Sequence, residues 1–199
     1  MVKVKICGLS RPCDIEAVNI AKPEYIGFVF ARSRRRVTPR QALELRKILR
    51  PDIVPVGVFV DEDMERIVSL ARGGVIGAVQ LHGREGEDYI QKIKALTGLP
   101  VIKAVAMEKA GDAQKWSGTS ADYLLLDHKG GGTGVHFNWD LIGEISKPYF
   151  LAGGLSAANV REAADKTKPF AVDASSGVET DGLKDPDKIG EFIKRVRLG

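Results

Sequence analysis

Cysteine is scarce in this sequence, which has only Cys7 and Cys13 among its 199 residues. Two cysteines cannot build a disulfide framework. Their spacing does not form a CxxC motif, and no second pair completes a zinc site. We therefore expect neither a disulfide scaffold nor a metal site.

Long apolar runs are also missing. No apolar stretch approaches the length that crosses a membrane. The N-terminus has no charged leader followed by a long apolar core, which a secretory signal would need. These observations predict a cytoplasmic protein with no membrane partner.

A strong charge of one sign is missing as well, since the formal net charge is only +4 at pH 7. The RSRRR cluster at Arg32–Arg36 is isolated and lacks the interleaved aromatic residues that stack on single-stranded nucleic acid. We expect no nucleic-acid partner. The mild positive excess is compatible with a small anionic ligand.

What the sequence does contain is a regular alternation of β-rich and helical segments, without a linker or a low-complexity stretch. The predicted strands are Val2–Ile6, Tyr25–Phe30, Val54–Val60, Ile76–Leu81, Pro100–Val105, Ala121–Asp127, Pro148–Gly154 and Pro169–Ser175. Tyr25–Phe30 is apolar throughout, as expected for a strand that is buried on both faces.

Helical patterns follow these strands. Thr38 and Pro39 are a typical start, with Gln41 placed to complete a capping box. The other helices are predicted from Ser10, from Asp61, around Tyr89–Leu96, around Glu108–Trp116, around Trp139–Ile145, from Ser156 and from Asp185.

Strands that alternate with helices predict parallel pairing. Eight such units are the number that closes a (β/α)₈ barrel, also called a TIM barrel. We therefore predict an α/β protein with one barrel domain over residues 1–199. The alternative is an open doubly wound sheet, which would need fewer strands or a second domain.

The active site of such a barrel lies at the C-terminal ends of its strands. Two glycine- and serine-rich turns follow strands seven and eight there, at Ala152–Ser156 and Asp173–Glu179. Small residues let backbone N–H groups approach an anion, and a following helix N-terminus adds a favourable field. The two loops together predict a phosphate site, although either one alone could be a tight turn.

Asp127 ends a strongly apolar strand beside the glycine-rich segment Gly131–Gly134. Partial burial would raise the pKa of its carboxyl group and suit it to proton donation. The alternative is an aspartate that caps a surface turn. The glycines could act as a hinge for a lid.

Cys7 ends the first strand, directly before Gly8. A thiol whose pKa is lowered by cations can act as a base or a nucleophile. With Asp127 it would form a base–acid pair that moves a proton between neighbouring atoms of a small substrate, and Gly8 would leave room for that substrate. Cys13 is interpreted as packed or exposed.

The three histidines are scattered, and we interpret them as structural or surface residues rather than metal ligands. They are His82, His128 and His136.

Several motifs occur together, in order, over nearly the whole chain. They are KICGL at Lys5–Leu9, GFVF at Gly27–Phe30, SRR at Ser33–Arg35 before Thr38–Pro39, VGVFV at Val56–Val60, QLHG at Gln80–Gly83, LLLD at Leu124–Asp127, GGTG at Gly131–Gly134, LAGGL at Leu151–Leu155 and VDASSGVE at Val172–Glu179. In these motifs the chain closely resembles the phosphoribosylanthranilate isomerase family of tryptophan biosynthesis.

The resemblance implies a cofactor-free, metal-free Amadori rearrangement of an aminoaldose, N-(5′-phosphoribosyl)anthranilate. The product is an aminoketose, 1-(2-carboxyphenylamino)-1-deoxyribulose 5-phosphate. By the resemblance, Cys7 is the general base at C2′ and Asp127 is the general acid at the ring oxygen.

The resemblance also implies the binding residues. Arg35 would hold the anthranilate carboxylate, which suits a guanidinium fork. Because three arginines are consecutive, a slip of one residue would give this role to Arg34 or Arg36. The residues implied for the phosphate end are Gly154, Ser175, Ser176 and Gly177, with Asp173 beside them. The partner is a small phosphosugar substrate, and the chain is a monomer or a homodimer.

Two alternatives remain open. A different phosphosugar barrel would share the phosphate loops but would place a metal site or a lysine pair at the barrel mouth, and Lys103 is the one residue that favours it. A non-catalytic protein that binds a phosphorylated ligand would keep the same loops without needing Cys7 and Asp127.

Overall fold

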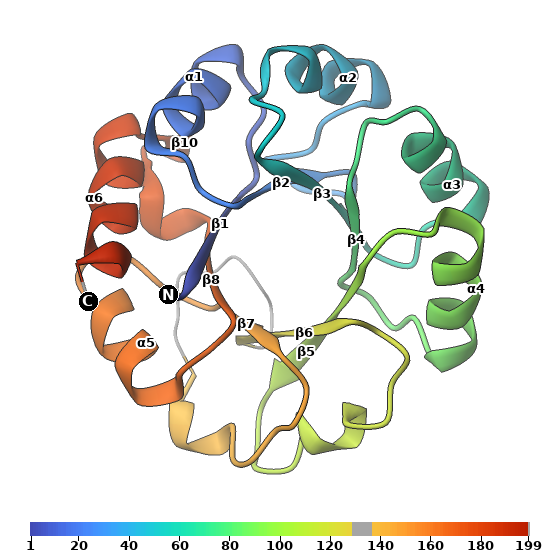
Figure 1. Cartoon of the computed structure of the whole chain (residues 1–199), viewed down its shortest axis with the longest axis vertical. Coiled ribbons are helices and arrows are strands. Elements are labelled where there is room, and N and C mark those ends of the chain that lie inside the picture. Colours follow the sequence, from blue (N-terminus) through green and yellow to red (C-terminus); the bar gives the residue numbers. More distant parts are fainter. Residues whose placement is uncertain (129–136, 199) are drawn as a thin grey trace.

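Eight parallel strands close into a barrel in sequence order from β1 to β8 (Figure 1). The computed structural model describes residues 1–128 and 137–198. The strands are β1 (Lys3–Cys7), β2 (Tyr25–Val29), β3 (Val54–Phe59), β4 (Ala78–Leu81), β5 (Val101–Met107), β6 (Tyr123–His128), β7 (Tyr149–Leu151) and β8 (Ala171–Ala174). β8 pairs with β1 and closes the ring, which confirms the predicted (β/α)₈ barrel.

Six α-helices in the described part of the chain surround the strands (Figure 1). They are α1 (Pro12–Ala21), α2 (Pro39–Ile48), α3 (Met64–Arg72), α4 (Glu87–Thr97), α5 (Val160–Thr167) and α6 (Pro186–Arg197). A short hairpin of β9 (Glu179–Thr180) and β10 (Leu183–Lys184) precedes α6. Among the residues described, no helix combines the length and apolar character that a membrane span requires.

Two of the predicted helix starts are confirmed. Thr38 caps α2 and forms a capping box with Gln41. Asp185 caps α6, and its carboxylate accepts hydrogen bonds from the backbone N–H groups of Asp187 and Lys188. Both caps satisfy donors that would otherwise be unpaired at the start of a helix.

The other three predicted starts were too early in the chain. Ser10 is replaced as the cap of α1 by Arg11, and both of their N–H groups donate to the Asp14 carboxylate. The cap of α3 is Asp63 because Asp61 has a left-handed φ of 46°. The remaining helix, α5, is capped by Asn159 rather than by Ser156.

Two predicted helices are wrong, because only short 3₁₀ turns occupy those regions. Gln114–Trp116 (η1) replaces the helix after β5, where the Asp112 carboxylate accepts the N–H groups of Glu108 and Lys109. Such local side-chain bonds compete with helix formation. The helix expected from Trp139 ends after Leu141 (η2), and Gly143 follows in the left-handed region.

Apolar residues pack in two layers. The larger layer lies between strands and helices, and Val4 and Ile6 of β1 belong to it. The smaller one lies inside the barrel. Because side chains alternate along a strand, Lys5 and Cys7 of β1 face the inside.

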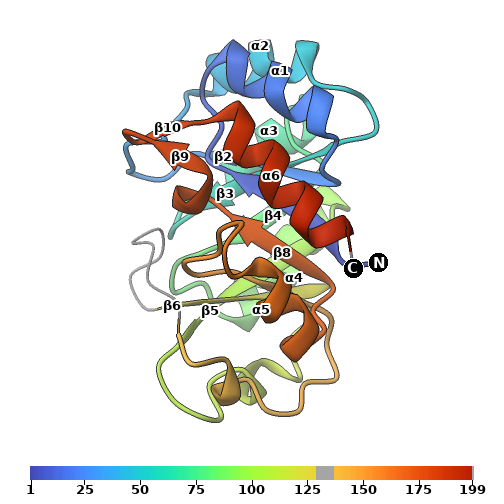
Figure 2. The ribbon, with the colours of Figure 1, turned by 90° about the vertical axis from the view of Figure 1, so that its left-hand side faces the viewer.

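The barrel is closed at the N-terminal ends of its strands. Tyr25, Tyr123, Phe150 and Phe170 pack there, with ring centroids 4.7 to 6.5 Å apart. Both chain termini lie on the side away from the β9–β10 hairpin (Figure 2). Ligand access is therefore expected from the opposite end, where the strands finish.

Candidate active site

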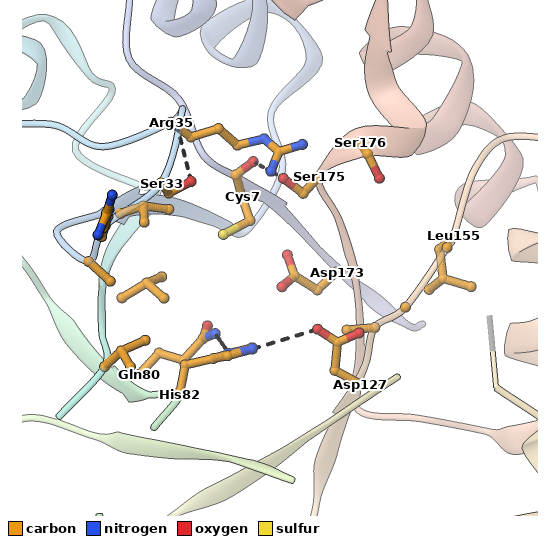
Figure 3. Close-up of a pocket in the computed structure, with 18 residues that line it drawn as sticks. Cys7, Ser33, Arg35, Gln80, His82, Asp127, Leu155, Asp173, Ser175 and Ser176 are labelled. Atoms are coloured by element: carbon orange, nitrogen blue, oxygen red, sulfur yellow. Dashed lines mark hydrogen bonds and ion pairs between the residues drawn. The ribbon is translucent and has the colours of Figure 1, made fainter. Parts of the chain in front are cut away.

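A cavity of about 240 Å³ opens at the C-terminal ends of the strands. Among the residues predicted for the site, all but Gly177 line it. Figure 3 shows Cys7 and Asp127 pointing into it from opposite sides, with Asp173 between them. The barrel thus brings together residues that are far apart in the chain.

Cys7 is held at the end of β1 with 8% of its surface exposed. Burial raises the pKa of its thiol, and the Lys5 and Lys184 ammonium groups oppose this effect. Cations beside a thiol lower its pKa. The cations are present, but desolvation outweighs them.

The glycines beside Cys7 serve close packing. A Cβ on Gly27 would lie 2.6 Å from the Cys7 Sγ, so only glycine leaves room for the thiol. A Cβ on Gly8, which has φ of 85°, would lie 2.4 Å from Cδ of Arg35. Gly8 therefore makes room for Arg35, and room for substrate beside Gly8 stays a prediction.

Asp127 is 8% exposed at the end of β6. Burial raises the pKa of its carboxyl group to about 6, and the negative charge of Asp173 adds to this effect. The N–H of His128 donates to Oδ1 at 2.8 Å and acts in the opposite direction. The expected upward shift of this pKa is confirmed.

His82, which the sequence analysis interpreted as a structural or surface residue, lines the cavity. Its Nε2 lies 3.7 Å from Oδ2 of Asp127. Its Nδ1 lies 2.9 Å from Nε2 of Gln80, an amide donor, so the ring proton belongs on Nε2 and faces Asp127. Burial and the Lys5 charge lower the pKa of His82 to about 4, which keeps the ring neutral near pH 7. Strand periodicity was the available signal, because His82 follows the inward-facing Gln80 by two positions.

The loops after β7 and β8 press against each other. Gly153 and Gly154 have φ of 83° and 63°, as tight turns require. A Cβ on Gly177 would lie only 1.9 Å from the carbonyl oxygen of Leu155. Gly177 is therefore a spacer between the loops, which explains its absence from the cavity wall. A short 3₁₀ helix, η3 (Ser176–Val178), begins within the loop after β8, whereas α5 begins only at Val160, beyond the loop after β7. A helical N-terminus therefore lies directly at the second loop alone.

The close approach at Gly177 predicts a stability effect. Gly177→Ala should lower the free energy of unfolding by about 1–3 kcal/mol, because the two loops must separate. Gly190→Ala is the control, since a Cβ there meets no atom within 4 Å. Urea unfolding followed by circular dichroism measures both. Equal stability of the two variants would contradict the role of Gly177 as a spacer.

Among the consecutive arginines, only Arg35 lines the cavity. Its Nε and Nη2 donate to the Glu179 carboxylate at 2.6 and 2.9 Å, and its side chain is 12% exposed. Arg34 also bonds Glu179 but is 58% exposed, and Arg36 faces solvent. Arg32, which the sequence analysis did not single out, lines the cavity as well.

Lys184 completes the support of this side of the cavity. Its Nζ lies 2.5 Å from Oε1 of Glu179 and donates to the carbonyl oxygen of Ser175 at 2.9 Å. Ser175 donates in turn to the Cys7 carbonyl at 3.0 Å. Hydrogen bonds from Arg35 and Lys184 outweigh burial and hold the pKa of Glu179 at about 2. The β9–β10 hairpin therefore links the arginine to the loop after β8.

Lys103 is not at the barrel mouth. It faces the helix layer, where its Nζ bonds the Gly83 carbonyl and the Glu85 carboxylate at 2.6 and 3.0 Å. Cys13 is exposed. No cluster of three or more histidine, cysteine or acidic residues that could hold a metal occurs within residues 1–128 and 137–198. Gly131–Gly134 and His136 lie outside the described residues.

A family model described as N-(5'phosphoribosyl)anthranilate (PRA) isomerase matches residues 4–195. An N-(5'-phosphoribosyl)anthranilate isomerase from Clostridium acetobutylicum is 47% identical over 205 residues, covering 99% of this chain and 98% of the relative. The phosphoribosyl anthranilate isomerase of Thermotoga maritima superposes with a TM-score of 0.91, at 38% identity and complete coverage of both chains.

Two further structures are similar over 100% of both chains. One is a phosphoribosyl anthranilate isomerase in complex with reduced 1-(o-carboxyphenylamino)-1-deoxyribulose 5-phosphate, with a TM-score of 0.88 and 37% identity. The other contains monomers generated from the dimeric Thermotoga maritima protein, with a TM-score of 0.88 and 38% identity.

Proposed function

Because this chain belongs to the N-(5'-phosphoribosyl)anthranilate isomerase family, we propose that it catalyses the Amadori rearrangement of N-(5′-phosphoribosyl)anthranilate in tryptophan biosynthesis. The observation that carries this proposal is the cavity itself. A thiol on β1 and a carboxyl group on β6 line one space, beside the loops after β7 and β8.

In the first step, Asp127 donates its proton to the ring oxygen of the substrate. The C1′–O bond breaks, and the nitrogen lone pair forms a Schiff base at C1′. A pKa of about 6 keeps a useful fraction of the carboxyl group protonated near neutral pH. His82 is neutral near pH 7 and has its ring proton on Nε2, toward the same carboxylate. It therefore offers no imidazolium that could protonate the substrate in place of Asp127.

In the second step, the Cys7 thiolate removes the proton from C2′. The pair from the broken C2′–H bond forms a C1′=C2′ double bond, and the C1′=N pair moves onto the nitrogen, which becomes an amine. The resulting enol tautomerises to the aminoketose, so atoms and charge balance without an external oxidant. Lys5 and Lys184 favour the thiolate form that this step needs.

The two ends of the substrate fit opposite parts of the cavity. The phosphate is assigned to the loops that contain Gly154, Ser175, Ser176 and Gly177, whose small side chains leave backbone N–H groups accessible. The anthranilate ring is assigned to the apolar wall from β2 and β3, and its carboxylate to Arg35.

Replacement of Arg35 tests the carboxylate assignment. Loss of a charge-assisted contact of about 1.5–3 kcal/mol should raise KM by about 10- to 100-fold in Arg35→Met. Glu179 keeps its bonds to Arg34 and Lys184, so the fold should persist. Arg34→Met is the matched control, expected to leave KM nearly unchanged. A KM increase confined to Arg34→Met would overturn the assignment.

The activity is tested by following the loss of substrate fluorescence with purified protein. Turnover should continue unchanged in excess chelator. Activity that required a divalent metal would favour the alternative phosphosugar barrel, whose lysine candidate, Lys103, is buried away from the cavity. Tight binding of a product analogue without any turnover would favour a binding protein.

Three further features of the proposal stay predictions. They are a single functional domain over residues 1–199, a cytoplasmic location, and a monomeric or homodimeric state.

A further inference from the structure

A buried ion pair lies inside the barrel, beneath the cavity. Nζ of Lys5 is 2.7 Å from Oδ2 of Asp173, and the Lys5 side chain is completely buried. The two residues are paired in register on neighbouring strands β1 and β8. Oδ1 of Asp173 is also buried and has no hydrogen-bond partner within the described part of the chain.

The fold alone gives no reason for this pair. The centre of the inner layer is apolar, with Val56, Ile102, Leu125 and Phe150. Replacing a buried ion pair by apolar residues of similar volume is often neutral or stabilising. A buried pair beside a cavity with titratable groups therefore points to a functional role.

Its position connects the pair to both proposed catalytic groups. Lys5 precedes Cys7 by two residues on the same face of β1. Asp173 lies between Cys7 and Asp127 and lines the cavity (Figure 3). The cation is thus placed under the base, and the anion is placed toward the acid.

The charges around Cys7 come from four segments. They are Lys5 on β1, Asp173 on β8, Lys184 on β10, and Arg35 in the loop after β2. After burial, Lys5 has the largest effect on the pKa of Cys7 and lowers it, whereas Asp173 raises it.

Asp127 faces a second set of charges: Asp173 on β8, Lys5 on β1, the adjacent His128, and His82 after β4. After burial, Asp173 has the largest effect on the pKa of Asp127 and raises it.

We propose, on the basis of the function proposed above, that Lys5 and Asp173 are positioning residues that set the charge states of the catalytic pair. Lys5 stabilises the negative charge that Cys7 carries as a base. Asp173 disfavours a second negative charge on Asp127 and so keeps this group in its acid form. Neither residue is required to exchange a proton with the substrate.

The test measures the ionisation of Cys7 without any turnover. In a Cys13→Ser background, which removes the exposed thiol, the rate of alkylation by iodoacetamide is followed against pH. Lys5→Met should move the midpoint upward by about 1 pH unit or more, because an opposite charge near the thiolate is lost. Lys3→Met is the matched control on the same strand and face. Lys3 lies over the ring of Phe170 at the closed end, so its removal should not move the midpoint.

Two more variants secure the result. Asp173→Asn should move the alkylation midpoint of Cys7 downward, because Asp173 raises the pKa of the thiol. It should also move the change of slope in the pH profile of kcat/KM below pH 6, because Asp127 then ionises more readily. Lys5→Met/Asp173→Asn leaves no unpaired buried charge, so it should fold even if Lys5→Met does not. Its midpoint should lie above that of the parent, because the effect of Lys5 on Cys7 exceeds that of Asp173.

An unchanged alkylation midpoint in Lys5→Met, or in the double variant if the single one does not fold, would overturn the proposal. This failure is distinct from failure of the proposed function. A parent protein that does not convert N-(5′-phosphoribosyl)anthranilate would refute the function, whereas the alkylation midpoints concern the ion pair alone.

Discussion

Cys7→Ser is expected to lower kcat by about 10²- to 10⁴-fold, the usual contribution of a positioned base. A serine hydroxyl keeps the size of the side chain but does not ionise in the accessible pH range, so no base remains at C2′. KM should change little, because Cys7 acts in proton transfer and not in holding either charged end of the substrate.

Steady-state kinetics of Cys7→Ser and Cys13→Ser measure this effect. Cys13 is exposed outside the cavity, so Cys13→Ser should retain full activity. A kcat for Cys7→Ser within about threefold of the parent would show that the thiol is not the base.

Asp127→Asn is expected to lower kcat by a similar factor, about 10²- to 10⁴-fold. The amide has the shape of the carboxyl group but cannot supply the proton that opens the ring. The variant should still bind a product analogue, because the proposal assigns neither charged end of the substrate to Asp127.

The pH dependence of kcat/KM provides a second, independent test of Asp127 as the general acid. The active form needs Asp127 protonated and Cys7 ionised, although the pKa of Asp127 is about 6 and burial raises that of Cys7 above its usual 9.0. Below pH 6 the fraction of this form rises with pH. Between the two pKa values it is constant, because loss of the acid offsets gain of the base, and above the pKa of Cys7 it falls.

Asp127→Asn should remove the change of slope near pH 6 from the pH profile of kcat/KM. The residual kcat/KM of the variant should rise with pH until Cys7 is ionised, and then stay level. A limb near pH 6 that persists in Asp127→Asn would assign the titration to another group.

Strand order and the ends of strands were predictable because they depend on local patterns. Counting strands placed Cys7 and Asp127, which end two of them, at the mouth of the barrel. Short helices were less predictable. The Asp112 side chain bonds the backbone locally, and Gly143 has a left-handed φ, so local turns form in place of helices. The spacing of apolar residues carries no information about either feature.

The support of the site could not be read from the sequence because it depends on contacts between distant segments. Arg35 bonds Glu179 across 144 positions, and Lys5 bonds Asp173 across 168. Gly177 is explained only by the Leu155 carbonyl oxygen that faces it. Strand periodicity could place His82 on an inward face, but its contact with Asp127 on another strand required the structure.

The most direct test of the central claim is the single-turnover rate of Cys7→Ala/Asp127→Asn, with enzyme in excess over N-(5′-phosphoribosyl)anthranilate. Binding of a reduced product analogue serves as the control for an intact site. We predict that the double variant binds the analogue with an affinity close to that of the parent. It should convert the substrate no faster than the uncatalysed reaction, because no acid–base pair remains. Conversion within about tenfold of the parent rate would contradict catalysis by Cys7 and Asp127.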